Sequence, residues 1–327
     1  MLLTILIPTY NRASDLDYNL NLLEQFIVNE SLANHVCVLI SNNCSSDDTK
    51  NVVSNHVSNN KIHINYYEQI TNIGLEQNAL FVLKKAETEY VMFLGDDDYV
   101  QEGYLSRVVL ELKQHPALGC IIPSNKGILS DKSEILGSGR EIDTSSTYYT
   151  AGFDACLANS WRGHQISGIV LQREGLYEEY IQCGVHNLYP FIFFVSYIAL
   201  KKDVLHLTDY PILVTRVPQT KKNWNYGQNG LLTDIFNNYR YLNVTKKQRG
   251  LLERNIIVKN EWRYLQYKDQ PYINKAIENV VFNINTSFDG KVFISEHTIC
   301  SKQYSGYKLR MFLFIVHTLV KIKRIFK

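Results

Sequence analysis

Three consecutive aspartates, Asp96, Asp97 and Asp98, follow the apolar run Tyr90–Leu94 and a single glycine. Carboxylates spaced along a turn can hold Mg²⁺ or Mn²⁺, because these cations prefer hard oxygen ligands. A cation held in this way can stabilise the charge of a departing diphosphate. A run of aspartates is also typical of a solvated turn or a helix cap. The apolar run directly before the aspartates favours the metal site over that second interpretation.

The elements before the aspartates must position them. The first 125 residues alternate short apolar runs with amphipathic stretches, which is typical of βαβ units in an α/β fold with a mostly parallel, Rossmann-like sheet flanked by helices. The predicted strands are Leu3–Ile7, Val36–Ser41, Ile62–Tyr67 and Tyr90–Leu94, and the predicted helices are Asp15–Phe26, a stretch through Val53, and Glu76–Ala86.

Two further loops are predicted to share an edge with the aspartates. Pro8–Arg12 follows the first strand and Asn42–Asp48 follows the second. Ligands of open α/β sheets bind outside the carboxyl ends of the strands, where such loops converge. The spacing therefore predicts one site built from three loops.

The rest of the chain carries weaker patterns. We expect a helix at Tyr104–Gln114, strands at Gly119–Pro123 and Ile166–Gln172, a loop or β-excursion over Gly127–Ser146, and an interior helix at Tyr189–Leu200. Past about Leu231 the character changes, and Gly230–Tyr267 and Tyr272–Phe282 read as helices of a C-terminal annex.

Composition excludes several classes of protein. Hydrophobic residues at 45% and charged residues at 20% of 327 residues are ordinary for a folded protein, and a net charge of +2 is far from that of a typical nucleic-acid binder. The six cysteines form no CxxC pair, and the N-terminus lacks a basic segment and a cleavage site. These features predict reduced thiols, no nucleic-acid partner and a cytoplasmic location.

Four motifs together carry a family resemblance. They are Ile5–Arg12, Ile40–Thr49, Asn72-Ile73-Gly74 with Asn78, and Phe93–Asp98. In order and spacing this set resembles the family 2 glycosyltransferases of GT-A fold, over about 100 residues of the chain. The resemblance implies transfer of a sugar from a nucleotide-diphosphate donor, with UDP-sugars favoured, by a metal-dependent and inverting enzyme. It covers only the donor-binding half.

Carried over by position, the resemblance implies a set of donor-binding residues. Asn42 stands where the family usually has an aspartate that faces the nucleobase. This difference leaves the identity of the nucleobase open. Asp97 aligns as the principal ligand of Mn²⁺ or Mg²⁺, Asp96 can face the ribose, and Asp98 is either a second ligand or a support. The implied donor-binding residues are Pro8, Thr9, Tyr10, Asn11, Arg12, Asn42, Asn72, Gly74, Asn78 and Asp96.

The catalytic base is harder to find, because the Glu-Asp pair that inverting members use is missing. His186 lies in the corresponding neighbourhood, before the apolar helix, and histidine can act as a base at neutral pH. Packing at the helix start is the competing interpretation for His186. Glu178 and Glu179 are alternatives one loop earlier, although such pairs are more often merely exposed.

The candidates for binding the acceptor are Trp161 and His164, in the stretch around the start of the predicted strand Ile166–Gln172. Trp161 can stack on a pyranose ring, or it can be an ordinary core tryptophan. This stretch resembles the abequosyltransferase-like branch of the family, which works in surface-polysaccharide assembly. Arg216 and the loop Lys221–Trp224 could close over the diphosphate, or the lysines could simply be solvated.

The tail from Tyr307 to Lys327 mixes apolar residues with basic ones. Only about ten residues separate Arg310 from Lys321, too few for the roughly 20 that cross a bilayer. We expect a basic amphipathic helix on the inner face of the cell membrane, with docking on the protein as the alternative. The membrane interpretation implies a saccharide acceptor that is lipid-linked.

These features divide the chain into a glycosyltransferase domain at 1–228, with a nucleotide-sugar half at 1–125 and an acceptor half at 126–228. The annex follows at 229–306 and the amphipathic helix at 307–327. Two rival functions remain, a nucleotide-sugar-binding protein without turnover and a nucleotidyltransferase. The missing Glu-Asp pair suggests the first, while the absence of a glycine-rich activating loop after strand one disfavours the second.

Overall fold

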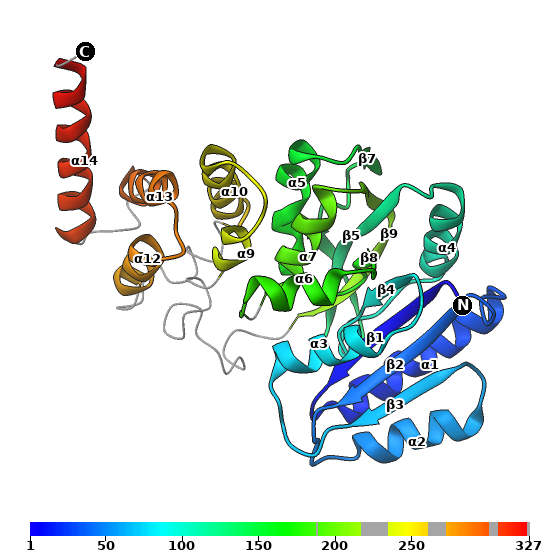
Figure 1. Cartoon of the computed structure of the whole chain (residues 1–327). Coiled ribbons are helices and arrows are strands. Elements are labelled where there is room, and N and C mark those ends of the chain that lie inside the picture. Colours follow the sequence, from blue (N-terminus) through cyan, green and yellow to red (C-terminus); the bar gives the residue numbers. More distant parts are fainter. Residues whose placement is uncertain (188, 217–234, 261–272, 301–306, 326–327) are drawn as a thin grey trace. The chain divides into compact units, whose positions relative to one another are not determined.

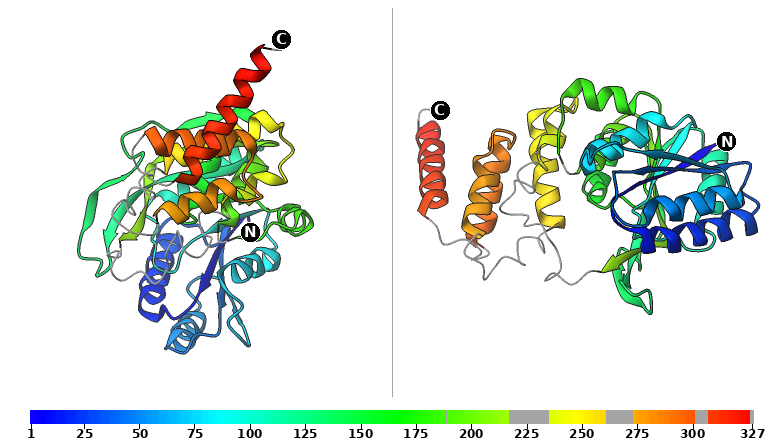
Figure 2. Two further views of the ribbon diagram at one scale, coloured as in Figure 1. Left: turned by 90° about the vertical axis from the view of Figure 1, so that its left-hand side faces the viewer. Right: turned by 90° about the horizontal axis from the view of Figure 1, so that it is seen from below.

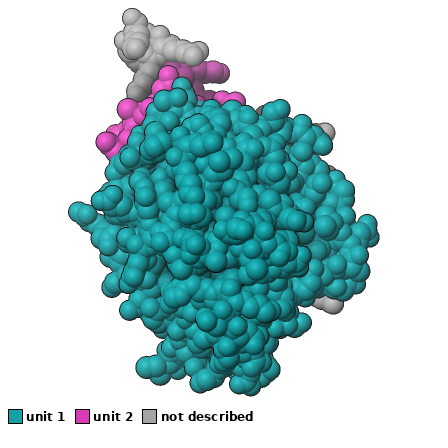
Figure 3. Space-filling model, turned by 90° about the vertical axis from the view of Figure 1, so that its right-hand side faces the viewer, with its two compact units in different colours: residues 1–184, 194–221 teal, residues 185–193, 222–327 magenta. Residues whose placement is uncertain are grey.

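The computed structural model describes residues 1–187, 189–216, 235–260, 273–300 and 307–325 (Figure 1). The chain divides into two compact units, which Figure 3 shows in different colours. Unit 1 comprises residues 1–184 and 194–221, and unit 2 comprises residues 185–193 and 222–327. The boundary predicted at residue 228 lies outside the described residues.

Unit 1 is built on a mixed sheet that has nine strands within the described residues. Their order is β3-β2-β1-β4-β8-β5-β9-β7, with β6 paired to β5. The β1–β2, β2–β3, β1–β4 and β5–β9 pairs are parallel, and the other pairs are antiparallel. The strands are β1 (Leu3–Thr9), β2 (Val36–Asn42), β3 (Ile64–Glu68), β4 (Tyr90–Phe93), β5 (Leu118–Leu129), β6 (Ile135–Arg140), β7 (Thr147–Tyr149), β8 (Val170–Gln172) and β9 (Asp203–Arg216).

Helices cover both faces of this sheet (Figure 2). On one face, apolar residues of α1, α2 and α4 form a continuous core with alternate residues of β1. On the other face, α3 packs on β1 and β2, and the ring of Phe93 lies 6.2 Å from that of Phe194. The helices of unit 1 are α1 (Ala13–Asn29), α2 (Thr49–Asn59), α3 (Leu75–Lys85), α4 (Tyr104–Gln114), α5 (Phe153–Asn159), the 3₁₀ turn η1 (Ser160–His164) and α6 (Leu176–Cys183), and α7 (Pro190–Ala199) spans both units.

Unit 2 is helical throughout its described residues from 237 onward, apart from short connections. Its helices are α9 (Asn237–Arg240), α10 (Lys246–Lys259), α12 (Ile273–Phe282), α13 (Phe288–Cys300) and α14 (Tyr307–Ile325). The buried carboxylate of Glu253 accepts hydrogen bonds from the Ser287 N–H and hydroxyl, which fixes the start of α13 against α10. The expected helical annex is present.

The local predictions of the first 125 residues are confirmed within a few residues, and α4 has the predicted bounds. The predicted helical stretch Gly230–Tyr267 is interrupted in its described part, because the chain leaves the helix between α9 and α10. Thr245 then begins α10 with a capping box, in which its hydroxyl accepts from Gln248 N–H at 3.2 Å. Strand β9 and helix α13 were not predicted.

Helix α14 has two apolar faces. Leu309, Leu313 and Val316 are buried, and α14 packs on α13. A second group of side chains is exposed, with Phe314 at 72% and Leu319 at 56%. Within the part of the chain that the structure describes, no helix combines the length and hydropathy that a membrane crossing requires.

Candidate active site

The aspartate cluster lies at the carboxyl end of β4, next to the loop that follows the neighbouring strand β1. The hydroxyl of Thr9, the last residue of β1, donates to Asp96 Oδ2 at 2.7 Å. The guanidinium of Arg12 lies 3.7 Å from Asp97 Oδ2 and also 3.7 Å from Asp15. Parallel pairing of β1 with β4 places the two loops at one edge, as the sequence predicted.

The three carboxylates differ in how firmly they are held. Asp98 is buried; its Oδ1 accepts the backbone N–H of Thr215 at 3.0 Å, and its Oδ2 accepts the Ser167 hydroxyl at 2.5 Å and the Gln165 amide at 3.0 Å. Asp97 is 26% exposed and faces Arg12. Both carboxylate oxygens of Asp98 therefore have hydrogen-bond partners in the protein, whereas Asp97 has the more open carboxylate. Metal binding by Asp97 and by Asp98 stays a prediction.

The cluster concentrates negative charge in a poorly solvated place. Burial, together with the charge of Asp97, raises the pKa of Asp96 to about 7 and that of Asp98 to about 7. Burial also raises the pKa of Asp97, whereas the positive charges of Arg12 and Lys132 lower it. The positive charges among the described residues therefore do not offset the rise in the pKa of these carboxyls.

This charge distribution fits a divalent cation. Among the described residues no group of three or more His, Cys, Asp or Glu side chains could hold a metal by itself. Mg²⁺ commonly takes one or two carboxylates and completes its shell with substrate phosphates and water. Asp97 could supply a carboxylate of that kind, with Asp96 and Asp98 adjacent.

Several residues of this site were missed by the sequence analysis. Asn19 of α1 is fully buried, and its amide donates to the backbone carbonyls of Gly95 and Asp98 at 3.0 and 2.9 Å. The Thr215 hydroxyl donates to the Asp97 carbonyl. Asn19 could have been found as a polar residue on an otherwise apolar helix face, whereas Thr215 and Gln165 carry no local signal.

The second loop is tied to the first. Asn11 has a φ of 53°, and its side-chain oxygen accepts the Ser46 N–H at 2.8 Å. Asn42 is fully buried; its amide donates to the Tyr66 hydroxyl at 3.0 Å and its oxygen accepts the Ser45 N–H at 2.9 Å. Both polar ends of Asn42 therefore have partners within the protein, one on strand β3 and one in the loop after β2.

The third predicted motif supports these loops. Asn72 accepts hydrogen bonds from the Asn43 amide at 3.0 Å and from the Gly74 N–H at 2.9 Å. Asn78 bonds to both the hydroxyl and the carbonyl of Ser41. These contacts give the residues a structural role, and donor contact by Asn72, Gly74 and Asn78 stays a prediction.

Two further donor-binding candidates, Tyr10 and Arg216, are exposed. Tyr10 is 46% exposed, beside the buried Pro8 and Thr9. Arg216 ends β9, and its positive charge lowers the pKa of the nearby Asp98 carboxyl. The loop at 221–224 lies outside the described residues.

The acceptor candidates occupy the turn before β8. Trp161 is 5% exposed, with the guanidinium groups of Arg162 and Arg140 at 5.1 and 5.8 Å from its ring. Stacking on a sugar would require this arrangement to open. His164 is half-buried, and Nδ1 lies 2.8 Å from the Trp161 carbonyl oxygen. His164 precedes Gln165, which contacts Asp98.

The three candidate bases are placed differently. Antiparallel pairing of β8 with β4 carries the chain to the sheet edge opposite the aspartates, where Arg173 N–H bonds to the Glu89 carbonyl. Helix α6 begins just after this point, with Glu178 exposed and Glu179 half-buried in its first turn. His186 is exposed and belongs to unit 2. All three roles stay predictions.

Parallel strands that deliver an acidic turn to the loop after β1, together with the antiparallel β8, define a glycosyltransferase fold of the GT-A type. A solved structure of residues 1–349 of Staphylococcus aureus TarS, in complex with UDP-GlcNAc, matches this fold with a TM-score of 0.64. The match covers 94% of this chain and 93% of that chain at 16% identity, so it bears on the fold alone.

Residues 4–166, about half of the chain, match the model of glycosyl transferase family 2, and the chain belongs to that family. It is 33% identical over 150 residues to a Campylobacter jejuni GalNAc(5)-diNAcBac-PP-undecaprenol beta-1,3-glucosyltransferase, covering 43% of this chain and 44% of the relative. It is 29% identical over 106 residues to the Salmonella typhimurium abequosyltransferase RfbV, covering 32% and 31%. The chain thus spans less than half the length of these relatives.

Lowering the pH from about 8 to about 6 is expected to stabilise the metal-free protein. The pKa of Asp96 and of Asp98 is about 7 in the folded chain and about 4 in an unfolded chain. The folded state therefore binds more protons over this interval, and its stability falls as the pH rises. Thermal unfolding in a chelator at the two pH values measures the slope.

Asp96→Asn should make the stability depend less steeply on pH, because it removes one of the two carboxyl groups with a raised pKa. Asp131→Asn is the matched control, since hydrogen bonds from Ser133 hold the pKa of that exposed carboxyl below its usual range. An Asp96→Asn variant with the wild-type slope would contradict the raised pKa.

Proposed function

We propose that the chain transfers a sugar from a nucleoside-diphosphate donor to a saccharide acceptor, with Mn²⁺ or Mg²⁺ as the cofactor. The observation that carries this proposal is the contact of the aspartate turn with the loop after β1, through Thr9–Asp96 and Arg12–Asp97. The excess negative charge of the turn supports a cation there, and family membership supports sugar transfer. Transfer assays with and without the cation test it.

In the proposed reaction the acceptor hydroxyl attacks the anomeric carbon while the bond to the diphosphate breaks. A bound divalent cation would supply stabilisation of the leaving diphosphate's charge. Asp97 would hold it, Asp98 would fix the turn through its own hydrogen bonds, and Arg12 would lie close to the phosphates. His186 is proposed to take the proton of the acceptor hydroxyl. Inversion is proposed from the family resemblance.

A UDP-sugar is the proposed donor. The TarS structure of the same fold contains UDP-GlcNAc, which supports this class of donor. Asn42, whose amide is held by Tyr66 and Ser45, would then shape the base pocket chiefly through the loop it fixes.

A lipid-linked saccharide at the inner face of the cell membrane is the proposed acceptor, in surface-polysaccharide assembly. The name of the Campylobacter jejuni relative, which includes PP-undecaprenol, supports an acceptor of this kind. The exposed apolar side chains of α14, with the exposed Lys308 and Arg310, support contact with an anionic lipid surface.

Asp97→Ala is expected to abolish metal-dependent hydrolysis and transfer of the donor, because it removes the open carboxylate of the cluster. Loss of at least about a hundredfold in rate is expected for such a ligand. Release of nucleoside diphosphate from a panel of nucleotide sugars measures the effect. Asp131→Ala, on an exposed turn, should keep the wild-type rate.

An Asp97→Ala variant that keeps its rate would remove the metal assignment. A wild-type chain that binds nucleotide sugars without hydrolysis or transfer would instead favour the rival function of a binding protein. Release of pyrophosphate would favour a nucleotidyltransferase.

His186→Ala is expected to lose about a hundredfold or more in transfer rate, which is the usual contribution of a general base. Donor affinity should stay near wild type, because the base acts on the acceptor. Transfer kinetics and calorimetric titration with UDP separate the two effects. His63→Ala, outside the proposed site, is the control, and an unchanged transfer rate in His186→Ala would move the base to Glu178, Glu179 or another residue.

Phe314→Glu combined with Leu319→Glu is expected to weaken binding to vesicles containing anionic lipid by at least about tenfold. Both side chains are exposed on α14, so their loss removes apolar area available to the bilayer but leaves the docked face intact. Vesicle co-sedimentation measures binding. Ile284→Glu changes a residue that is 82% exposed outside α14 and should have no effect; equal loss in both variants would contradict a role of α14.

A further inference from the structure

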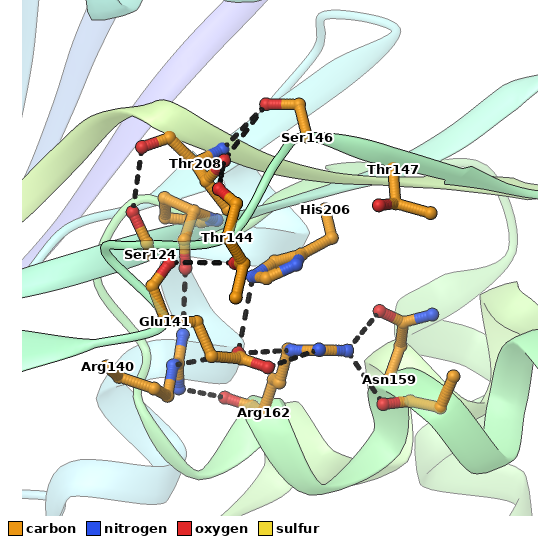
Figure 4. A network of polar contacts seen from close by, with 12 residues as sticks. Ser124, Arg140, Glu141, Thr144, Ser146, Thr147, Asn159, Arg162, His206 and Thr208 are labelled. Atoms are coloured by element: carbon orange, nitrogen blue, oxygen red, sulfur yellow. Dashed lines mark hydrogen bonds and ion pairs between the residues drawn. The ribbon is translucent and has the colours of Figure 1, made fainter.

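A second polar cluster in unit 1 lies away from the aspartates and is drawn in Figure 4. Glu141, directly after β6, accepts a bidentate pair of hydrogen bonds from Arg162, with Nε to Oε2 at 2.7 Å and Nη2 to Oε1 at 2.6 Å. His206 Nε2 lies 3.3 Å from the same carboxylate. Arg162 is 6% exposed and His206 is 3% exposed, so the pair is largely shielded from water.

The ionised form of this pair is well supported. Burial alone would raise the pKa of Glu141, but the hydrogen bonds from Arg162 and the nearby His206 ring outweigh burial and hold the pKa well below its usual range. Glu141 also has a φ of 56°, a conformation that L residues seldom adopt and that persists when the surroundings determine it. A buried ion pair adds little net stability, and in some proteins such a pair instead fixes the geometry of the groups around it.

Arg162 lies within the turn η1, and both its side chain and its backbone carbonyl make hydrogen bonds that hold the turn in place. Arg162 Nη1 donates to the Ala158 carbonyl and to Asn159 Oδ1, both at 2.7 Å. The carbonyl of Arg162 in turn accepts from Arg140 Nη1 and from the Gln165 N–H, both at 3.2 Å. Figure 4 shows the Arg162 guanidinium between Glu141 and Asn159. A five-residue 3₁₀ turn, which is weak by itself, is thereby fixed at its side chain and its backbone.

The residues that directly follow η1 in the chain make the hydrogen bonds to Asp98. Gln165 and Ser167 both donate to Asp98 Oδ2, and the Ser167 hydroxyl also accepts the Gly95 N–H at 3.0 Å. Gly168 bonds through its N–H to the Phe93 carbonyl at 2.8 Å. Gln165, the first residue after Arg162 that contacts the aspartate turn, therefore lies only three positions further along the chain.

We propose that Glu141 and Arg162 are positioning residues for the aspartate cluster, acting through Gln165 and Ser167 on Asp98. The inference rests on the proposed function, because it assigns the pair to the donor and cation site. Ion pairs that only stabilise the fold would leave the affinity of that site unchanged. A positioning pair sets the orientation of Asp98, and with it the geometry of Asp97 one residue before.

The test measures Mn²⁺-dependent affinity for UDP by calorimetry, alongside thermal unfolding. Glu141→Gln keeps the size of the side chain but removes the charge, and we expect affinity to fall about tenfold, as for other partners that orient metal ligands. Glu134→Gln, an exposed carboxylate on the turn between β5 and β6, is the matched control and should bind as wild type. Unchanged affinity with a lowered unfolding temperature in Glu141→Gln would overturn the proposal.

A double-mutant cycle decides whether the effect passes through the proposed path. Gln165→Ala should weaken binding by itself, and the double variant with Glu141→Gln should lose less than the product of the two single losses. Fully multiplicative losses would overturn the path. If Glu141→Gln does not fold, Arg162→Lys, which keeps the charge but loses the bidentate geometry, replaces it with the same expected direction.

A wild-type chain that binds no UDP would refute the proposed donor, and the inference is then judged by hydrogen exchange. Amides of residues 165–169 should exchange faster in Glu141→Gln than in wild type or in Glu134→Gln. Unchanged exchange in this segment would overturn the positioning role independently of the ligand.

Discussion

The structure of unit 1 depends on keeping three adjacent carboxylates at the end of β4 in a place where water solvates them poorly. Charges of one sign this close together repel, and burial makes the repulsion stronger. The chain meets this constraint with neutral hydrogen-bond donors, namely Thr9, Thr215, Ser167 and Gln165, and with the guanidinium of Arg12 beside Asp97. Such an arrangement holds the turn in shape but leaves much of its charge available to a cation.

This constraint explains why the two halves of the domain form one sheet. The carboxylates of Asp96 and Asp97 face Thr9 at the end of β1 and Arg12 in the loop after it, whereas the Asp98 carboxylate is held by residues 67 to 117 positions further along the chain. Strand β9 pairs with β5 over residues 203–207 and again over 212–216, and the second stretch brings Thr215 to the aspartates. A nucleotide-binding half that ended near residue 125 would therefore lack the partners of its own third carboxylate.

Features that depend on residues close together in the sequence could be predicted, whereas features that depend on contacts between distant segments could not. Strands β1, β2 and β4 are short apolar runs, and α1 and α4 are amphipathic, so local periodicity was sufficient. Strand β9 was missed because Thr208, Asp209 and Pro211 interrupt its apolar pattern in the middle. The motif residues of the first loop were found, but Asn19, Gln165 and Thr215 act through contacts between distant segments that no local pattern encodes.

Helix α14 shows a different limit of sequence patterns. From the sequence, membrane contact and docking on the protein are alternatives, because each would use the same apolar face of the helix. In the structure the docked residues are Leu309, Leu313 and Val316, while Phe314 and Leu319 remain exposed. Leu309, Leu313 and Val316 recur at helical spacing along one face, and Phe314 and Leu319 lie outside that face, so docking occupies only part of the apolar surface. Packing against α13 therefore leaves the second face available, and the two interpretations are compatible in one helix.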